Sequence, residues 1–181
     1  MLQFKLFKVY NGESTLDKLD GKFSNMIRFS NNVIGIPYDY GINGYRKVLE
    51  SVKDLPIKQY IMTPEKFFKV LNYSIELGYH VNSLNFLESV PPEHQEIISH
   101  YKQQINAETD ISKKQLIANK FFNELDWIIT DESIDIKDLS LRIKSDTTPV
   151  HVEVDIYNNG VLLFDNESIK SQVINLIKSI E

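Results

Sequence analysis

The 181-residue chain contains no cysteine, and this absence excludes several chemistries at once. Without thiols the chain cannot form disulfides, thiolate nucleophiles, cysteine-ligated zinc sites or iron–sulfur clusters. Arginine is also scarce, with 17 lysines against 3 arginines, alongside 22 isoleucines and 15 asparagines. This bias is typical of AT-rich genomes, such as those of low-GC bacteria, their phages and other mobile elements, and it concerns source rather than function.

Long hydrophobic runs are missing as well. No stretch approaches the ~20 apolar residues that cross a bilayer. The chain begins MLQFKLFKVY, which alternates polar with apolar residues, whereas a signal peptide has a basic segment followed by an apolar block. We therefore expect a cytoplasmic protein that does not engage a membrane.

The composition itself is that of a globular domain. Hydrophobic residues make up 42% of the chain and charged residues 25%, which are ordinary values for a folded protein. A single domain over residues 1–181 is the expectation at this length. A subdomain division is placed near residues 127–133, where the pattern changes from helices to strands.

Periodicity predicts the elements and the fold class. Strand patterns cover 2–10, 26–36, 57–62, 79–86, 134–143, 150–156 and 161–164, and Asn31 and Asn32 mark a bulge or a turn within the second of them. Strand 150–156 alternates, with His151, Glu153 and Asp155 expected to point outward. Helical patterns cover 45–52, 64–77, 91–106, 109–125 and 165–180. Together they predict an α+β domain with a mixed, mainly antiparallel sheet of about 6 strands covered by about 5 helices. Asn159-Gly160 indicates a C-terminal hairpin of the type I′ family, followed by a helix.

Known catalytic motifs are incomplete in this chain. A phosphate-binding loop ending at Gly21-Lys22 requires glycine at position 16 and Ser or Thr at position 23, but these positions hold Leu16 and Phe23. The patterns G-x-G-x-x-G, G-x-S-x-G and H-E-x-x-H are also missing. No catalytic residue is assigned, and no cofactor is expected.

Charge is divided unevenly along the chain. Residues 1–75 hold 11 Lys or Arg and 7 Asp or Glu, a net of +4, whereas residues 76–181 hold 9 and 18, a net of −9. An acidic surface speeds association with a basic protein and repels nucleic acid. We therefore predict that the acidic residues of the second half bind a basic protein partner, namely Asp131, Glu132, Asp135, Asp138, Glu153 and Asp155.

A loop rich in tyrosine is a second candidate contact surface. Tyrosine offers a large contact area at low entropic cost, and loops often carry binding residues. The residues assigned to partner binding here are Tyr38, Asp39 and Tyr40.

Two alternatives use other residues. Carboxylates of strand 150–156 and of the segment before 136 could hold Mg²⁺ or Mn²⁺ in a metal-dependent nuclease or phosphoesterase, with Asp131, Asp135, His151, Glu153 and Asp155 as ligands. Alternatively, basic and aromatic residues of the N-terminal half could bind single-stranded nucleic acid by charge and stacking, through Lys5, Lys8, Lys18 and Lys22 interleaved with Phe4, Phe7, Tyr10 and Phe23. The interpretation we carry forward is a non-catalytic binding protein of the inhibitor, immunity or regulatory kind.

Overall fold

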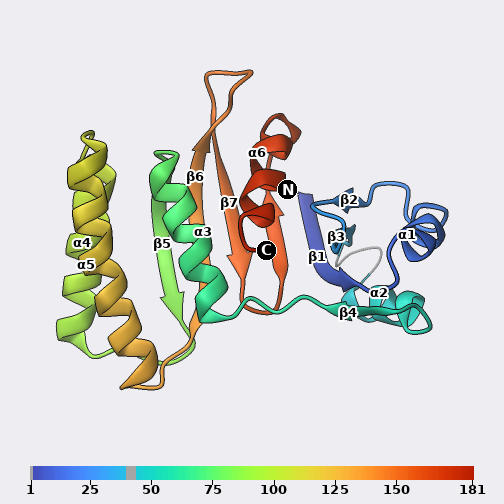
Figure 1. Ribbon diagram of the computed structural model, residues 1–181, viewed down its shortest axis with the longest axis horizontal. Coiled ribbons are helices and arrows are strands. Elements are labelled where there is room, and N and C mark those ends of the chain that lie inside the picture. The colour runs from blue at the N-terminus through green and yellow to red at the C-terminus, as the bar shows by residue number, and fades with distance from the viewer. Residues whose placement is uncertain (1, 40–43) are drawn as a thin grey trace.

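Strands and short helices share the first half of the chain, and two long helices, three strands and a last helix follow (Figure 1). This arrangement is that of a computed structural model, which describes residues 2–39 and 44–181. The elements in order are β1 (Leu2–Val9), α1 (Glu13–Asp20), β2 (Ile27–Arg28), β3 (Val33–Pro37), α2 (Tyr45–Val52), β4 (Ile57–Gln59), α3 (Pro64–Glu76), β5 (His80–Phe86), α4 (Pro92–Ala107), α5 (Ile111–Thr130), β6 (Ile136–Lys144), β7 (His151–Tyr157), β8 (Val161–Phe164), the 3₁₀ helix η1 (Glu167–Ile169) and α6 (Lys170–Lys178).

The described strands form one sheet. Its order is β2-β3-β1-β8-β7-β6-β5, with β4 paired to β1. All the pairings between these strands are antiparallel. On one side β1 pairs with β3, and on its other side it pairs first with β8 and then with β4. The α+β class, the mainly antiparallel sheet and the C-terminal hairpin followed by a helix are therefore confirmed.

The described part of the chain holds six α-helices and eight strands, somewhat more elements than the sequence predicted. Helix α1 was missed because it has eight mostly polar residues, and only Leu16 and Leu19 offer buried aliphatic side chains. The predicted strand over 26–36 is a hairpin of β2 and β3. Its turn is fixed by the Ser30 hydroxyl oxygen, which accepts hydrogen bonds from the N–H groups of Asn32 and Val33.

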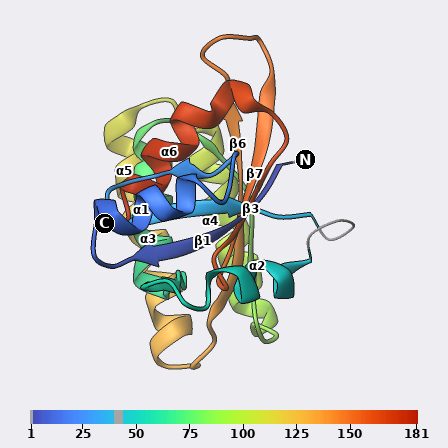
Figure 2. The same ribbon diagram turned by 90° about the vertical axis from the view of Figure 1, so that its right-hand side faces the viewer.

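Side chains of β1 alternate between two hydrophobic cores, one on each face of the sheet. Phe4 and Leu6 belong to the larger core, which α3, α4, α5 and α6 cover, whereas Phe7 and Val9 belong to a smaller core under α1 and α2. Figure 2 views the molecule from the end that carries α1 and α2. Residues 127–133 run from the last turn of α5 into the connection to β6, and Ile128 there belongs to the larger core.

The turn between β7 and β8 lies next to β1, in the middle of the sheet. Gly160 has a φ of 76° and its N–H donates to the Tyr157 carbonyl oxygen at 2.9 Å. Asn159 does not share the positive φ, so the predicted type I′ turn is wrong. The loop instead has three residues and ends on a glycine in the left-handed region, another common hairpin closure. The Gly160 carbonyl oxygen accepts a hydrogen bond from the Leu6 N–H at 2.8 Å, which ties the turn to β1.

Helix α4 covers the outer edge of β5. The Asn106 side chain accepts from the Val81 N–H at 2.9 Å and donates to the Val81 carbonyl oxygen at 2.8 Å, as a neighbouring strand would. Lys102 donates to the Asn82 carbonyl oxygen at 2.9 Å. An unpaired edge strand invites pairing with another chain, so these contacts protect this side of the sheet.

Within residues 2–39 and 44–181, no helix has both the length and the apolar character required to span a membrane.

Candidate functional site

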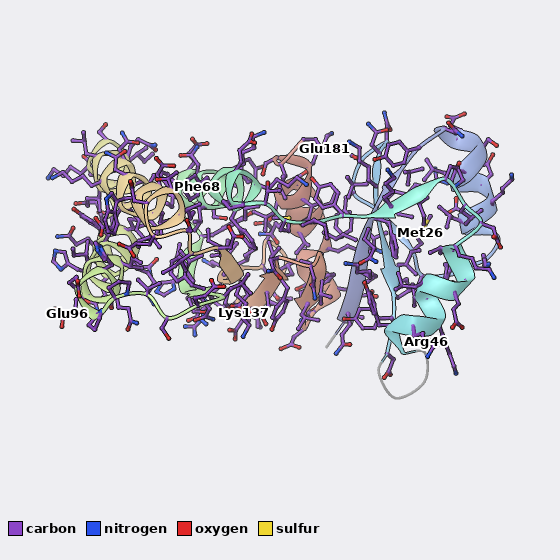
Figure 3. The ribbon with its side chains drawn as sticks, turned by 90° about the horizontal axis from the view of Figure 1, so that it is seen from below. Met26, Arg46, Phe68, Glu96, Lys137 and Glu181 are labelled. Carbon is purple, nitrogen blue, oxygen red and sulfur yellow. The ribbon has the colours of Figure 1, made fainter. Side chains whose placement is uncertain are left out.

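In the described part of the chain, no helix lies over the face of β5, β6 and β7 that points away from the larger core. Figure 3 shows the sheet from below. Helix α3, labelled at Phe68, and Glu181 lie on one side of the sheet. Helix α2, labelled at Arg46, lies on the other side, next to the N-terminal strands. On β7, Val152, Val154 and Ile156 are buried, while His151 and Glu153 are exposed. This is the inward and outward alternation that the sequence predicted, and it leaves an open face of polar side chains.

One end of this open face carries a hydrogen-bonded network of acids. Strand register places Ser140 opposite Asp155 and Arg142 opposite Glu153. The Glu153 carboxylate accepts from the Asn82 amide and from the Ser140 hydroxyl, both at 2.8 Å. Asp138, only 9% exposed, accepts from the Asn85 amide at 2.7 Å. We call Asp138, Glu153 and Asp155 the acidic triad. Its hydrogen-bond partners lie on two strands, β5 and β6, so the carboxylates are fixed before any partner arrives.

The environment of Asp155 is unfavourable for its charge. Burial raises the pKa of the Asp155 carboxyl above its ordinary value of 3.8, and the negative charges of Glu153, Asp138 and Asp165 raise it further. The Ser140 hydroxyl partly offsets these effects by hydrogen bonding. Like charges in proximity disfavour ionisation of each other, so the neighbouring carboxylates add to the larger effect of burial on the pKa of Asp155.

The other end of the open face is basic. Lys144 lies opposite His151, and Arg142 lies opposite His80. The pKa of His80 is lowered, first by burial and then by the positive charges of Arg142, Lys102 and His151. Basic residues therefore gather toward one end of the open face and acidic residues toward the other, and the two groups meet where Arg142 lies opposite Glu153.

The remaining predicted acids lie on the connection from α5 to β6. Asp131, Glu132 and Asp135 are all exposed there. The connection leads into β6 two residues before Asp138, so these acids extend the acidic end of the open face toward the rim of the sheet. The structure thus places Asp131, Glu132, Asp135, Asp138 and Asp155 toward the end of the sheet where β6 begins and β7 ends. Glu153 lies nearer the start of β7, opposite Arg142.

Of the tyrosine loop, only part lies within the described residues. Tyr38 is 6% exposed, belongs to the smaller core and has its ring edge-on to that of Tyr45 at 6.3 Å between centroids. The assignment of Tyr38 to partner binding is therefore corrected, because a ring inside the core presents no contact area. Asp39 is exposed at the end of this segment. Tyr40 lies outside the described residues.

The residues of the metal hypothesis are spread over two places. His151 and Asp155 are four residues apart on one strand, roughly 13 Å along it, and Asp131 and Asp135 are on the connection before β6. In the described ranges, no group of three or more His, Asp or Glu side chains is placed to hold a metal ion.

The lysines of the nucleic-acid hypothesis are also dispersed. Lys5 is fully buried, and its amine donates to the Asn159 carbonyl oxygen and lies 5.6 Å from the centre of the Tyr45 ring. Lys22 donates to the Ser51 carbonyl oxygen of α2. Lys8 is exposed at the end of β1. They do not form a continuous track.

Sequence reasoning missed Asn82, Asn85 and Ser140, the neutral residues that hold the acidic triad. Asp138, Ser140 and Arg142 occupy alternate positions on β6, so their spacing was a usable signal, but amides of β5 join them only through strand pairing.

Compared with known proteins, the chain matches no protein-family model, no curated protein and no solved structure.

Proposed function

We propose that this protein is a non-catalytic binding protein, of the inhibitor, immunity or regulatory kind, that docks a basic protein on the acidic end of its open sheet face. The observation that carries the proposal is the acidic triad. Asp138, Glu153 and Asp155 come together on a face without a covering helix, and the pKa of Asp155 is raised in part by its acidic neighbours.

The acids of this surface make no ion pair within the described residues, although Arg142 is the register partner of Glu153. Among the described residues, ion pairs join Arg28 to Asp20, Arg46 to Glu50, Lys69 to Glu65 and His94 to Glu124. None of these pairs includes a member of the acidic triad or an acid of the connection before β6. Lysine or arginine side chains of a partner would relieve the repulsion, and complementary charge accelerates association 10- to 1,000-fold in favourable cases, by an order-of-magnitude estimate.

The shape of the surface also favours protein docking. An antiparallel sheet with one open face offers a broad platform, and side chains held by hydrogen bonds lose little entropy on binding. The hydrogen bonds from Asn82, Asn85 and Ser140 supply that rigidity.

Charge reversal tests the proposal. The variant Asp131→Lys/Glu132→Lys/Asp135→Lys changes only exposed side chains of the connection, and Glu153→Gln/Asp155→Asn removes two charges of the triad while keeping side-chain shape. Immobilised wild-type and variant proteins would capture partners from a cell lysate, with identification by mass spectrometry and salt elution of each captured protein.

We expect both variants to lower capture of the same basic proteins by about tenfold or more at low salt. The control Glu93→Lys/Glu96→Lys/Asp126→Lys makes the same reversal on exposed positions of α4 and α5 and should capture as the wild type does. Equal capture by wild type and both site variants, with unchanged salt dependence, would overturn the proposal.

A further inference from the structure

A cavity of about 560 Å³ opens on the helix-covered side of the sheet, away from the acidic triad. It lies where β1 and β4 end, next to the start of α3 and close to the last residues of the chain, where Figure 3 labels Glu181. The lining residues that matter are Lys8, Tyr10, Lys58, Tyr60, Lys66 and Glu181.

Two of these lysines face each other across a strand pair. Lys8 of β1 is the register partner of Lys58 of β4, so both side chains leave the sheet on the same face. The ring of Tyr10 lies between them, with each ammonium nitrogen 5.8 Å from the ring centre. Like charges directly opposite on neighbouring strands destabilise the pairing, and in the described residues no carboxylate is within ion-pair distance of either amine.

A third lysine closes the cavity from α3. The Lys66 amine lies 3.9 Å from the centre of the Tyr60 ring and uses one of its three N–H donors on the Ile61 carbonyl oxygen at 2.5 Å. The pKa of Lys66 is lowered, first by burial and then by the positive charge of Lys8, although Glu65 acts in the opposite direction. The ammonium groups of Lys8 and Lys66 are therefore near enough to repel each other.

Lysines outnumber acidic side chains in the lining of the cavity. Glu181 is the single acidic residue among the described residues that line it. Thr63 at the start of α3 also lines the cavity, and its side chain makes no hydrogen bond to the first turn of that helix. A cluster of amines held together on rigid elements without matching carboxylates is favourable for an anion that supplies several acceptor oxygens.

We propose that the cavity bounded by Lys8, Lys58 and Lys66 binds a small phosphorylated molecule. Its volume is within the range of small-molecule sites, roughly 300–1,000 Å³. Nucleic acid requires a positive track that follows the backbone, but here the amines surround one cavity, Lys5 is buried, and Lys22 is bonded to the Ser51 carbonyl oxygen of α2. This site is independent of the acidic triad and of any protein partner.

Inorganic pyrophosphate is the probe for this site. Isothermal titration calorimetry at about 50 mM ionic strength, where screening is modest, should give a Kd below about 1 mM. The variant Lys8→Gln/Lys58→Gln should weaken binding at least about tenfold. Lys113→Gln/Lys120→Gln removes the same charge from exposed positions of α5 and should leave the Kd within about twofold, since screening isolates distant charges.

Folding and ligand class are checked in parallel. In phosphate-free buffer the Lys8→Gln/Lys58→Gln variant should melt at the wild-type temperature or above it, because the cross-strand repulsion is gone. The inference is wrong if pyrophosphate gives no heat up to about 10 mM, or if the α5 control loses as much affinity. Tighter binding of a twelve-residue oligothymidylate than of pyrophosphate, lost in the Lys8→Gln/Lys58→Gln variant, would also overturn it by assigning the site to nucleic acid.

Discussion

Two side chains of this protein, those of Asp155 and Lys5, lie where the charged form is less stable than it is in water. Asp155 is crowded by acids on the open face, and Lys5 is fully buried in the sheet. Both have pKa values moved toward the neutral form. Such shifts make the stability of the fold depend on pH, since the folded and unfolded chains then bind different numbers of protons.

The substitution Asp155→Asn should stabilise the protein at neutral pH. Because the folded-state pKa of Asp155 is raised above 3.8, its contribution to stability is fully present below the unfolded pKa and is lost as the pH rises through the folded pKa. At pH 7 the variant should unfold with a free energy higher by ~0.5 kcal/mol, discounted for partial exposure. The gain should vanish near pH 3.5, where both states bind the proton.

Urea unfolding between pH 3.5 and 7 measures this difference. Asp126→Asn, on the exposed surface of α5, controls for the loss of one negative charge. A variant less stable than wild type at every pH would show instead that the Asp155 carboxylate makes a net favourable interaction.

The substitution Lys5→Met should remove an alkaline pH dependence. Burial lowers the pKa of Lys5 from 10.5 to about 8. Between these values the folded chain has released a proton that the unfolded chain still holds, so the free energy of unfolding rises with pH through this window. Relative to Lys5→Met, the wild type should gain roughly 1–3 kcal/mol between pH 7.5 and 10.5, measured by urea unfolding. Parallel stability curves of the two proteins would show that the amine titrates as an exposed lysine does.

At the scale of elements, the β7–β8 turn depends on the absence of a side chain at Gly160. A Cβ added there would lie 1.9 Å from the Tyr60 carbonyl oxygen, and φ is +76°. Both a clash with backbone and a disfavoured dihedral result, so Gly160→Ala should destabilise the protein by about 3 kcal/mol or more. Chemical denaturation checks this value.

Gly78→Ala is the matched control for that change. Gly78 ends α3 with a φ of +72°, yet an added Cβ would meet nothing within 4 Å. The free energy of unfolding should fall only by the cost of placing alanine in the left-handed conformation, about 1 kcal/mol. Equal losses for Gly78→Ala and Gly160→Ala would refute the close approach of the turn to Tyr60.

Local signals predicted most elements because their causes are local. Asp110 caps α5 by accepting from the Lys113 N–H, and Gly78 takes the left-handed conformation that ends α3. Thr63 precedes α3, but its side chain makes no capping hydrogen bond. Helix α1 lacked such signals, since it begins after a glycine and buries few apolar side chains.

At the scale of the whole molecule, the features that the sequence did not predict depend on contacts between distant segments. Alternation on β7 correctly predicted that Glu153 faces outward. That Asp138 joins it depends on the register of β6 with β7, and the burial of Lys5 depends on a turn more than 150 residues away. The cavity lysines come from β1, β4 and α3, whose meeting no local pattern indicates.

The central claim is that the open face carries a negative field at the end formed by the acidic triad. Nuclear magnetic resonance with cationic and anionic nitroxide probes measures this field directly, through the paramagnetic relaxation of each amide. We expect the amides of residues 138, 153 and 155, and those of 131–135, to relax faster with the cationic probe, and the amides of residues 8 and 58 to relax faster with the anionic one. Equal relaxation by the two probes at the acidic triad, or faster relaxation by the anionic probe, would show that no negative field exists there.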